Sequence, residues 1–257
     1  MALLTPTANI SLAGYSIRST NSAALSALLQ ERLVGHIKTV LVFANANCVM
    51  QCQHLRTWLS GENVVLVNDG IGVDIAAMMV VGHRFEENLN GTDFLPFLFT
   101  QLATQQKVYL VGGMPEIAER AGKFIEAKFG HQVVGIQDGF SRIDPVLLQT
   151  RINSSGADVV LVALGNPRQE EWIKANAPNL NAPLVIGVGA LLDFLSGTVV
   201  RAPVWMRALH LEWLFRLGHE PRRLMRRYTI DIGRFLSLCL RYPRDPLKQV
   251  KANGVRR

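Results

Sequence analysis

The sequence predicts an α/β fold of the Rossmann-like type, with a mostly parallel sheet covered by helices on both faces. Apolar, β-branched runs recur along the chain, and segments with helical spacing separate them. The runs are continuously rather than alternately hydrophobic, which is typical of strands that are buried on both faces. With 257 residues, of which 49% are hydrophobic and 18% charged, the chain has enough apolar side chains for one large core.

Six segments are predicted strands. They are expected at 37–45, 62–70, 107–113, 131–139, 157–165 and 182–189. Two of the helices between them, starting near Pro115 and Pro167, carry proline where a first helical turn tolerates it. The alternation of strands and helices predicts βαβ units and therefore a parallel sheet.

The charge of the chain is concentrated at its C-terminal end. Residues 1–200 hold 13 Lys and Arg against 16 Asp and Glu, a net charge of −3. Residues 201–257 hold 14 against 4, a net charge of +10. This contrast predicts a mildly acidic body over 1–200 and a basic helical appendage over 201–257.

Residues 222–242 predict an amphipathic helix that ends at Pro243. One side of the helix carries Leu224, Tyr228, Phe235 and Cys239, with arginines beside them. A basic helix with an apolar stripe suits the anionic inner face of a membrane, which favours a peripheral membrane position. The alternative is a helix that packs on its own domain and leaves its arginines in solvent.

Two non-enzyme classes compete with a catalytic function. A basic stripe is also the electrostatic footprint of a nucleic-acid-binding protein. The chain has no recognition motif and no aromatic residues interleaved with the basic ones, and its body is acidic, so nucleic acid is disfavoured as a partner. A membrane-binding module without activity is the other alternative, but it leaves the polar strand ends described below unexplained.

The cysteines predict a reducing compartment. Cys48 and Cys52 lie four residues apart on a predicted helix, and Cys239 stands alone. No histidine or further cysteine lies close in sequence to the first two, as a zinc site would need. We therefore expect reduced core cysteines, no metal site and a cytoplasmic protein. The absence of a long apolar run and of a signal-peptide pattern agrees with that location.

The predicted strands end in polar residues or glycine. These ends are Asn45, Asp69, Gly112–Gly113, Asp138, Gly165–Asn166 and Gly189. In open parallel sheets the carboxyl ends of the strands form the crevice that binds ligands. A turn explains any one of these residues equally well. Taken together, with Asp69 and Asp138 each followed by glycine, they favour a site.

Two motifs extend the predicted site. VGGMPE, residues 111–116, joins a strand to a helix start, and the bare N–H groups of a helix N-terminus suit a diphosphate. GNPRQEEW, residues 165–172, places Asn166, Arg168 and Gln169 at another helix start, either as a solvated first turn or as part of the crevice.

Missing motifs narrow the chemistry. The chain contains neither GxGxxG nor GxxxxGK[ST], which disfavours a dinucleotide-dependent dehydrogenase and an NTPase. It also lacks Asp-x-Asp, the short motif that holds a divalent metal on a nucleotide-sugar diphosphate. A diphosphate leaving group would here need arginines or backbone amides to neutralise it.

A longer stretch, residues 187–228, resembles a known family. It reads GVGALLDFLSGTVVRAPVWMRALHLEWLFRLGHEPRRLMRRY and is similar to the signature of the WecG/TagA/CpsF glycosyltransferases, glycosyltransferase family 26. GNPRQEEW resembles that family's Gly-x-Pro-x-Gln-Glu block. NDG at 68–70, NLNGTD at 88–93 and VGG at 111–113 match in order and approximate spacing. The resemblance covers roughly residues 10 to 240.

The resemblance implies a reaction and a set of roles. It implies an inverting, metal-independent and cofactor-free transfer of a sugar from a UDP-sugar to a polyprenyl-diphosphate-linked sugar, with the C-terminal appendage closing over the site. Asp69 matches the proposed catalytic base. Asn45, Gln169 and Asp193 match binding residues, and the appendage arginines expected to hold the UDP diphosphate include Arg216, Arg223 and Arg226. The predicted substrate site is completed by Asn88, Thr92, Gly112, Gly113 and Asp138.

Two departures from the family pattern bear on the sugar. Phe43 stands where many members have threonine, and Asn88 stands where many have arginine. Both positions are expected to shape the sugar pocket. The pattern FANAN…ENLNGTD resembles the exopolysaccharide branch typified by GumM, which implies glucose as the transferred sugar. Transfer of N-acetylmannosamine or N-acetylmannosaminuronic acid is the alternative within the family.

Overall fold

The protein is built on one eight-stranded sheet in the order β1-β2-β4-β3-β8-β7-β5-β6. The computed structural model describes residues 9–141, 143–203, 206, 212–219 and 221–242. The strands are β1 Asn9–Leu12, β2 Tyr15–Arg18, β3 Thr39–Ala44, β4 Val64–Asn68, β5 Lys107–Gly112, β6 Gln132–Gln137, β7 Val159–Ala163 and β8 Leu184–Gly187. Only β1 and β2 pair antiparallel among these strands. The predicted α/β fold and its six predicted strands are confirmed.

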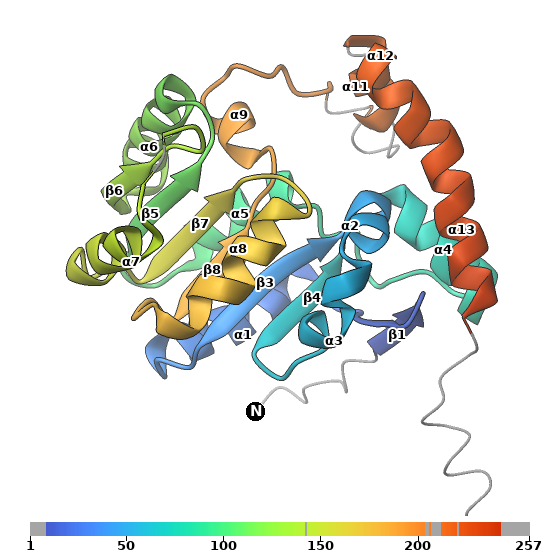
Figure 1. Cartoon of the computed structure of the whole chain (residues 1–257), viewed down its shortest axis with the longest axis horizontal. Helices are drawn as coiled ribbons and strands as arrows, with labels where there is room; N and C mark the ends of the chain where they lie inside the picture. The colour runs from blue at the N-terminus through green and yellow to red at the C-terminus, as the bar shows by residue number, and fades with distance from the viewer. Residues whose placement is uncertain (1–8, 142, 204–205, 207–211, 220, 243–257) are drawn as a thin grey trace, which may run out of the picture.

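Helices cover both faces of the sheet (Figure 1). One face packs against α1 Ser22–Val34, α5 Gly91–Gln101, α6 Pro115–Phe129 and α9 Leu191–Leu195. The other packs against α2 Ala46–Gln51, α3 Arg56–Leu59, α4 Ile71–Val81, α7 Pro145–Ser154 and α8 Arg168–Asn176, with short 3-10 helices at Gln53–Leu55 and Ala177–Asn179. Neighbouring strand residues point to opposite faces, so Leu41 and Val42 enter different cores. This double burial explains why the strand sequences are apolar throughout.

The β1–β2 hairpin lies at one edge of the sheet and extends it beyond the predicted strands. Ala13 and Gly14 form its turn with φ values of 51° and 78°, the left-handed conformation that a tight hairpin needs. Tyr15 is buried beneath α2 and donates its hydroxyl to Val49 O at 3.0 Å. The hairpin therefore closes the β4 edge and supports the helix that follows β3.

The C-terminal tail is helical and packs on the body. It comprises α11 Glu212–His219, α12 Pro221–Arg226, a π-helical turn η3 Arg227–Asp231 and α13 Ile232–Arg241. Phe235 and Cys239 are buried in the same core as α2 and α4. Beyond them, Tyr242 lies against Gly14 and accepts a cation–π contact from Arg56, whose carbon Cζ is 4.7 Å from the ring centroid. The predicted helix is confirmed, while its predicted stop at Pro243 lies outside the described residues.

None of the helices in the described ranges is long and apolar enough to span a membrane.

Candidate active site

The carboxyl ends of β3 and β4 place Asn45 and Asp69 side by side. Ala44 and Asn68 are register partners in this parallel pair, so the residues that follow them leave the sheet together. The Asn45 side-chain amide donates to Asp69 Oδ2 at 3.0 Å. Asn45 Oδ1 accepts from the Cys48 N–H and so caps α2. These two bonds hold the half-buried Asp69 carboxylate in a defined position above the sheet.

The loop after Asp69 brings Asn88 to the same strand end. Gly70 has a φ of 86°, which glycine adopts without strain. Its N–H donates to Asn88 Oδ1 at 2.8 Å. The buried Asn68 adds a second link, because its Nδ2 donates to Glu87 O at 2.9 Å. The structure thus joins three predicted site residues, Asn45, Asp69 and Asn88, in one cluster.

A buried polar network joins the ends of β7 and β8. Glu170 is fully buried, and its Oε1 accepts from Asn166 Nδ2 at 2.7 Å and from Gln169 Nε2 at 2.9 Å. Gln169 is only 3% exposed, and its Oε1 accepts the Gly189 N–H at 2.8 Å. Burial raises the pKa of Glu170, and the donated hydrogen bonds oppose that rise. Gln169 therefore fastens the start of α8, after β7, to the β8 end through its Oε1, while its Nε2 is held by the neighbouring Glu170.

The network continues into α2. Asn47 Nδ2 donates to Asn166 Oδ1 at 3.2 Å, and the Cys52 thiol donates to Glu170 Oε2 at 3.5 Å. Glu170 thereby connects the helix after β3 with the helix after β7. The polar side chains at these strand ends support one another rather than standing free in the crevice.

Cys48 and Cys52 are buried and free, as predicted, and Cys239 is buried and free as well. The Sγ atoms of Cys48 and Cys52 and a carboxylate oxygen of Glu170 lie within 4.8 Å of one another, close enough to share an ion. The hydrogen bond with Cys52 and then burial raise the pKa of the Cys48 thiol well above its usual value. Because metals bind thiolates rather than thiols, this surrounding favours the protonated cysteines of a packed core.

Gly112 and Gly113, at the end of β5, allow this strand to lie close to β7. Their φ values are 111° and 75°, and a Cβ on Gly112 would lie 2.3 Å from Ala163 O. Glycine is therefore required for the close approach of the two strands. The Gly113 N–H donates to Ala163 O at 3.2 Å, so this amide is already used within the protein. The helix predicted to follow is α6, which starts at Pro115.

Asp138 follows β6 at one edge of the sheet, whereas Asp69 follows β4, the third strand from the other edge. Its Oδ1 accepts the N–H groups of Phe140 at 2.8 Å and Ser141 at 2.6 Å. Hydrogen bonds from Ser141, and then from Phe140, lower the pKa of Asp138. Strand β6 is four positions from β3 in the sheet, which amounts to about 20 Å at the usual strand spacing. The structure does not bring Asp138 to the Asn45–Asp69 cluster.

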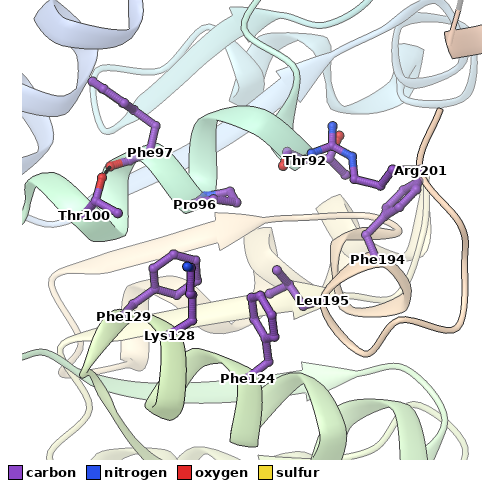
Figure 2. A pocket seen from close by; sticks show the side chains of 10 residues that line it. All are labelled: Thr92, Pro96, Phe97, Thr100, Phe124, Lys128, Phe129, Phe194, Leu195 and Arg201. Atoms are coloured by element: carbon purple, nitrogen blue, oxygen red, sulfur yellow. Dashed lines mark hydrogen bonds between the residues drawn. The ribbon is translucent and has the colours of Figure 1, made fainter. Parts of the chain in front are cut away.

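Thr92 lies at the start of α5, beside an apolar pocket. Its hydroxyl donates to Asn90 Oδ1 at 2.7 Å, and its carbonyl accepts from Arg201 Nη1 at 3.4 Å. Figure 2 shows the pocket, of about 440 Å³, between α5, α6 and α9. It is lined mainly by Pro96, Phe97, Phe124, Phe129, Phe194 and Leu195. Arg201 at its rim is paired with Asp93 at 2.7 Å. The Asn45–Asp69 cluster does not line this pocket.

Asp193 stands on the short helix α9 that follows β8. It is half-buried, and its carbonyl accepts from the N–H groups of Thr198 and Val199, both at 3.1 Å. Asp193 thereby shapes the turn that leads the chain from β8 toward Arg201 and the tail.

Residues 10–249 match the family model described as the Glycosyl transferase WecG/TagA/CpsF family. This match spans the sheet, the helical tail and the cluster of Asn45, Asp69 and Asn88 at the strand ends. The chain belongs to this family. The coarse activity follows, because membership assigns the protein to the glycosyltransferases, which move a sugar from a donor to an acceptor.

In this family member the tail reaches the rim of the strand-end cluster. The π-helical turn η3 packs against α2, the helix capped by Asn45. Of the predicted diphosphate ligands, Arg226 on α12 is exposed. Arg216 and Arg223 lie on α11 and α12, but their side chains fall outside the described part of the chain. The tail is thus attached next to the cluster, with Arg226 open to solvent.

Two residues that join α2 to the neighbouring strand ends were not predicted from the sequence. Glu170 and Asn47 were not among the predicted site residues, yet together they link α2 to the β7 and β8 ends. Glu170 does stand in the GNPRQEEW block next to Gln169, and that adjacency was the available signal. Nothing in the sequence placed Asn47 opposite Asn166, because 119 positions separate them.

Proposed function

We propose that the protein transfers a hexose, specifically glucose, from a UDP-sugar to a polyprenyl-diphosphate-linked sugar in exopolysaccharide or cell-surface glycan synthesis. Membership of a glycosyltransferase family supports sugar transfer in general. The observation that carries the proposal is the Asp69 carboxylate, held by Asn45 where β3 and β4 end.

The proposed mechanism is a single displacement. Asp69 accepts the proton of the acceptor hydroxyl as that oxygen forms its bond to C1 of the donor sugar. The bond between C1 and the UDP oxygen breaks at the same time, and UDP leaves with the electron pair. Attack from the face opposite UDP inverts the configuration at C1. Asn45 keeps Asp69 in place, and the Gly70–Asn88 bond fixes the loop that follows it.

The leaving diphosphate gains negative charge, and we assign its neutralisation to arginines of the tail. A guanidinium group binds phosphate oxygens with two parallel hydrogen bonds and stays charged at any working pH. Arg226 is exposed on α12, and the tail contacts α2 beside the cluster. Arg216 and Arg223 complete the proposed set. Because Asp-x-Asp is missing from the sequence, we propose that this transfer needs no divalent metal.

The donor sugar is proposed from one of the two departures in the family pattern. Asn88 accepts the Gly70 N–H and so lies beside the loop that follows Asp69, where it is proposed to contact the donor sugar. Phe43 is buried, 6.1 Å from Phe94 between ring centroids, and packs beneath Gly91. Phe43 belongs to the core and is not exposed to a sugar, so the expectation that it shapes the sugar pocket directly is wrong. Asn88 puts a short amide where many members have arginine, and this replacement favours an unmodified hexose over an acetamido sugar.

The experiment is a donor panel. The purified protein is incubated with a lipid-diphosphate-linked glucose as acceptor and one donor at a time: UDP-glucose, UDP-galactose, UDP-N-acetylmannosamine or UDP-N-acetylmannosaminuronic acid. The mass of the lipid product is then measured by mass spectrometry. We expect one added hexose with UDP-glucose. Addition of an acetamido sugar instead would assign the alternative specificity. The absence of a lipid-linked product with every donor would reject the proposed reaction.

We place this reaction at the inner membrane face, because a polyprenyl-linked acceptor is anchored in the lipid. The basic tail and the acidic body support this location, since cations near an anionic leaflet each contribute ~1 kcal/mol to binding.

A further inference from the structure

The apolar pocket between α5, α6 and α9 is a groove that runs along α5. Thr92 and Arg201 lie at one end of it, and Thr100 and Lys128 lie at the other (Figure 2). At 1.5 Å per residue, α5 rises about 12 Å between Thr92 and Thr100. The volume of the groove, about 440 Å³, is within the range of small-molecule sites, about 300–1,000 Å³. The groove is therefore large enough for a ligand, and its shape favours an elongated one.

The walls of the groove are apolar. Pro96 of α5 lies across the groove from Phe124 of α6 and Leu195 of α9 (Figure 2). The rings of Phe124 and Phe129 meet edge to face, with centroids 5.9 Å apart. Phe124 is 40% exposed, so a large part of this ring contacts water until a ligand covers it. Because burial of apolar surface is favourable, such walls favour an apolar chain over a sugar or a nucleotide.

The two charged residues that line the groove, Arg201 and Lys128, are both basic. Arg201 stands at the Thr92 end, where its Nη1 donates to Thr92 O at 3.4 Å and its Nη2 is paired with Asp93 at 2.7 Å. Its Nε has no hydrogen-bond partner among the described residues. A guanidinium group carries several N–H donors in a fixed fork, so Arg201 has a donor left for an anion. This end of the groove therefore suits the anionic head of an apolar chain.

The Arg201 end of the groove adjoins the strand-end cluster. Helix α5 starts at Gly91, where an added Cβ would lie 3.3 Å from the ring of Phe43. Phe43 belongs to β3, and the cluster begins where this strand ends. The loop before α5 carries Asn88, which accepts the Gly70 N–H at 2.8 Å. The groove thus starts beside the proposed base and leads away from it along α5.

We propose that this α5–α6 groove binds the first isoprene units of the polyprenyl diphosphate that carries the acceptor sugar. The inference rests on the proposed function and assigns the apolar part of that acceptor. The chain lies along Pro96, Phe124 and Leu195, and the diphosphate lies at the Arg201 end, where its oxygens accept from the guanidinium. The acceptor sugar then lies between the diphosphate and Asp69. A polyprenyl diphosphate is apolar, elongated and anionic at one end, and the groove matches each of these properties.

The test measures the binding of two probes to the full chain by calorimetry, with no donor present. Farnesyl diphosphate carries the diphosphate head and a short isoprenoid chain, whereas inorganic diphosphate carries the head alone. We expect farnesyl diphosphate to bind about tenfold or more tightly, because only its chain buries apolar surface.

The variants separate the chain from the head. Phe124→Gln should lower the affinity for farnesyl diphosphate about fivefold or more and leave that for inorganic diphosphate unchanged, while Phe124→Leu should retain most of the affinity. Arg201→Gln should weaken the binding of both probes. Ile37→Gln is the matched control, because Ile37 is 49% exposed, Phe124 is 40% exposed, and Ile37 does not line the groove.

Several results would overturn the inference. They are equal affinities of the wild type for the two probes, unchanged binding of farnesyl diphosphate in Phe124→Gln or in Arg201→Gln, and an equal loss in Ile37→Gln. If light scattering shows a dimer that Phe124→Gln converts to a monomer, with farnesyl diphosphate affinity unchanged, the groove is the contact with a second copy. Failure of the proposed sugar transfer with intact binding of farnesyl diphosphate would reject the function and leave the groove standing.

Discussion

Gln169 is predicted to act as an internal clamp, and its replacement by alanine should destabilise the protein before any substrate is bound. Its side chain is 3% exposed, accepts the Gly189 N–H and donates to Glu170. Gln169→Ala leaves that N–H without its partner and takes one donor from a buried carboxylate. A buried group left unsatisfied costs about 1–3 kcal/mol. The two losses together come to roughly 3 kcal/mol, because Asn166 and Cys52 still donate to Glu170.

For a chain of this size, 1 kcal/mol corresponds to a shift in Tm of about 2–4 °C, so we expect a fall of roughly 6–12 °C. The assay is thermal unfolding without substrate, followed by titration with UDP. Arg168→Ala is the matched control, because Arg168 stands in the same first turn and is exposed. Two results together would refute the structural role of Gln169. One is a Tm within about 1 °C of the wild type, which is less than the change from a single lost hydrogen bond. The other is a strongly raised KM for the UDP-sugar. Gln169 would then be a direct ligand of the substrate.

Three further predictions concern the tail, Glu170 and metal. Phe235→Ala removes a fully buried ring that anchors α13, and it should lower the free energy of unfolding by about 3–5 kcal/mol. We expect faster amide hydrogen exchange over 221–241, with little change in β3. Exchange over 221–241 as slow as in the wild type would contradict the anchoring. Burial raises the pKa of Glu170 above its ordinary 4.5, so its protonation favours the folded state. The stability of the wild type relative to Glu170→Gln should therefore be highest below that pH and decline as the pH rises through the folded-state pKa; a difference in unfolding free energy that does not vary with pH would oppose this. Sugar transfer should persist in excess EDTA, and activity that vanishes and returns with Mg²⁺ or Mn²⁺ would overturn the metal-independent reaction.

The strands of the central sheet were predictable because each is a continuous apolar run with a polar or glycine end. The β1–β2 hairpin escaped prediction, since its strands span Asn9–Leu12 and Tyr15–Arg18. Four residues hold too few repeats for a periodic pattern to stand out. The prediction of the α6 start at Pro115 succeeded because a proline at the first helical position is a local signal.

The candidate site was predictable in part, for a comparable reason. Asn45 and Asp69 follow neighbouring strands and meet by register alone, so their proximity was implied once the sheet was parallel. Asp138 follows a strand of the same kind, but the order of strands in the sheet places it at the far edge. That order depends on long-range packing, which no local pattern encodes. The burial of Phe235 was equally hidden, because an amphipathic stripe does not state which neighbour will cover it.

The proposed reaction depends on Asp69 as the base that deprotonates the acceptor. The most direct measurement is the turnover of Asp69→Asn with saturating UDP-glucose and lipid-linked acceptor, beside calorimetric binding of UDP. Asparagine keeps the size of the side chain and its ability to bond to Asn45, but it cannot take the proton. We expect a fall in kcat of about 10²-fold or more, with UDP affinity retained. A kcat near that of the wild type would show that another group removes the proton.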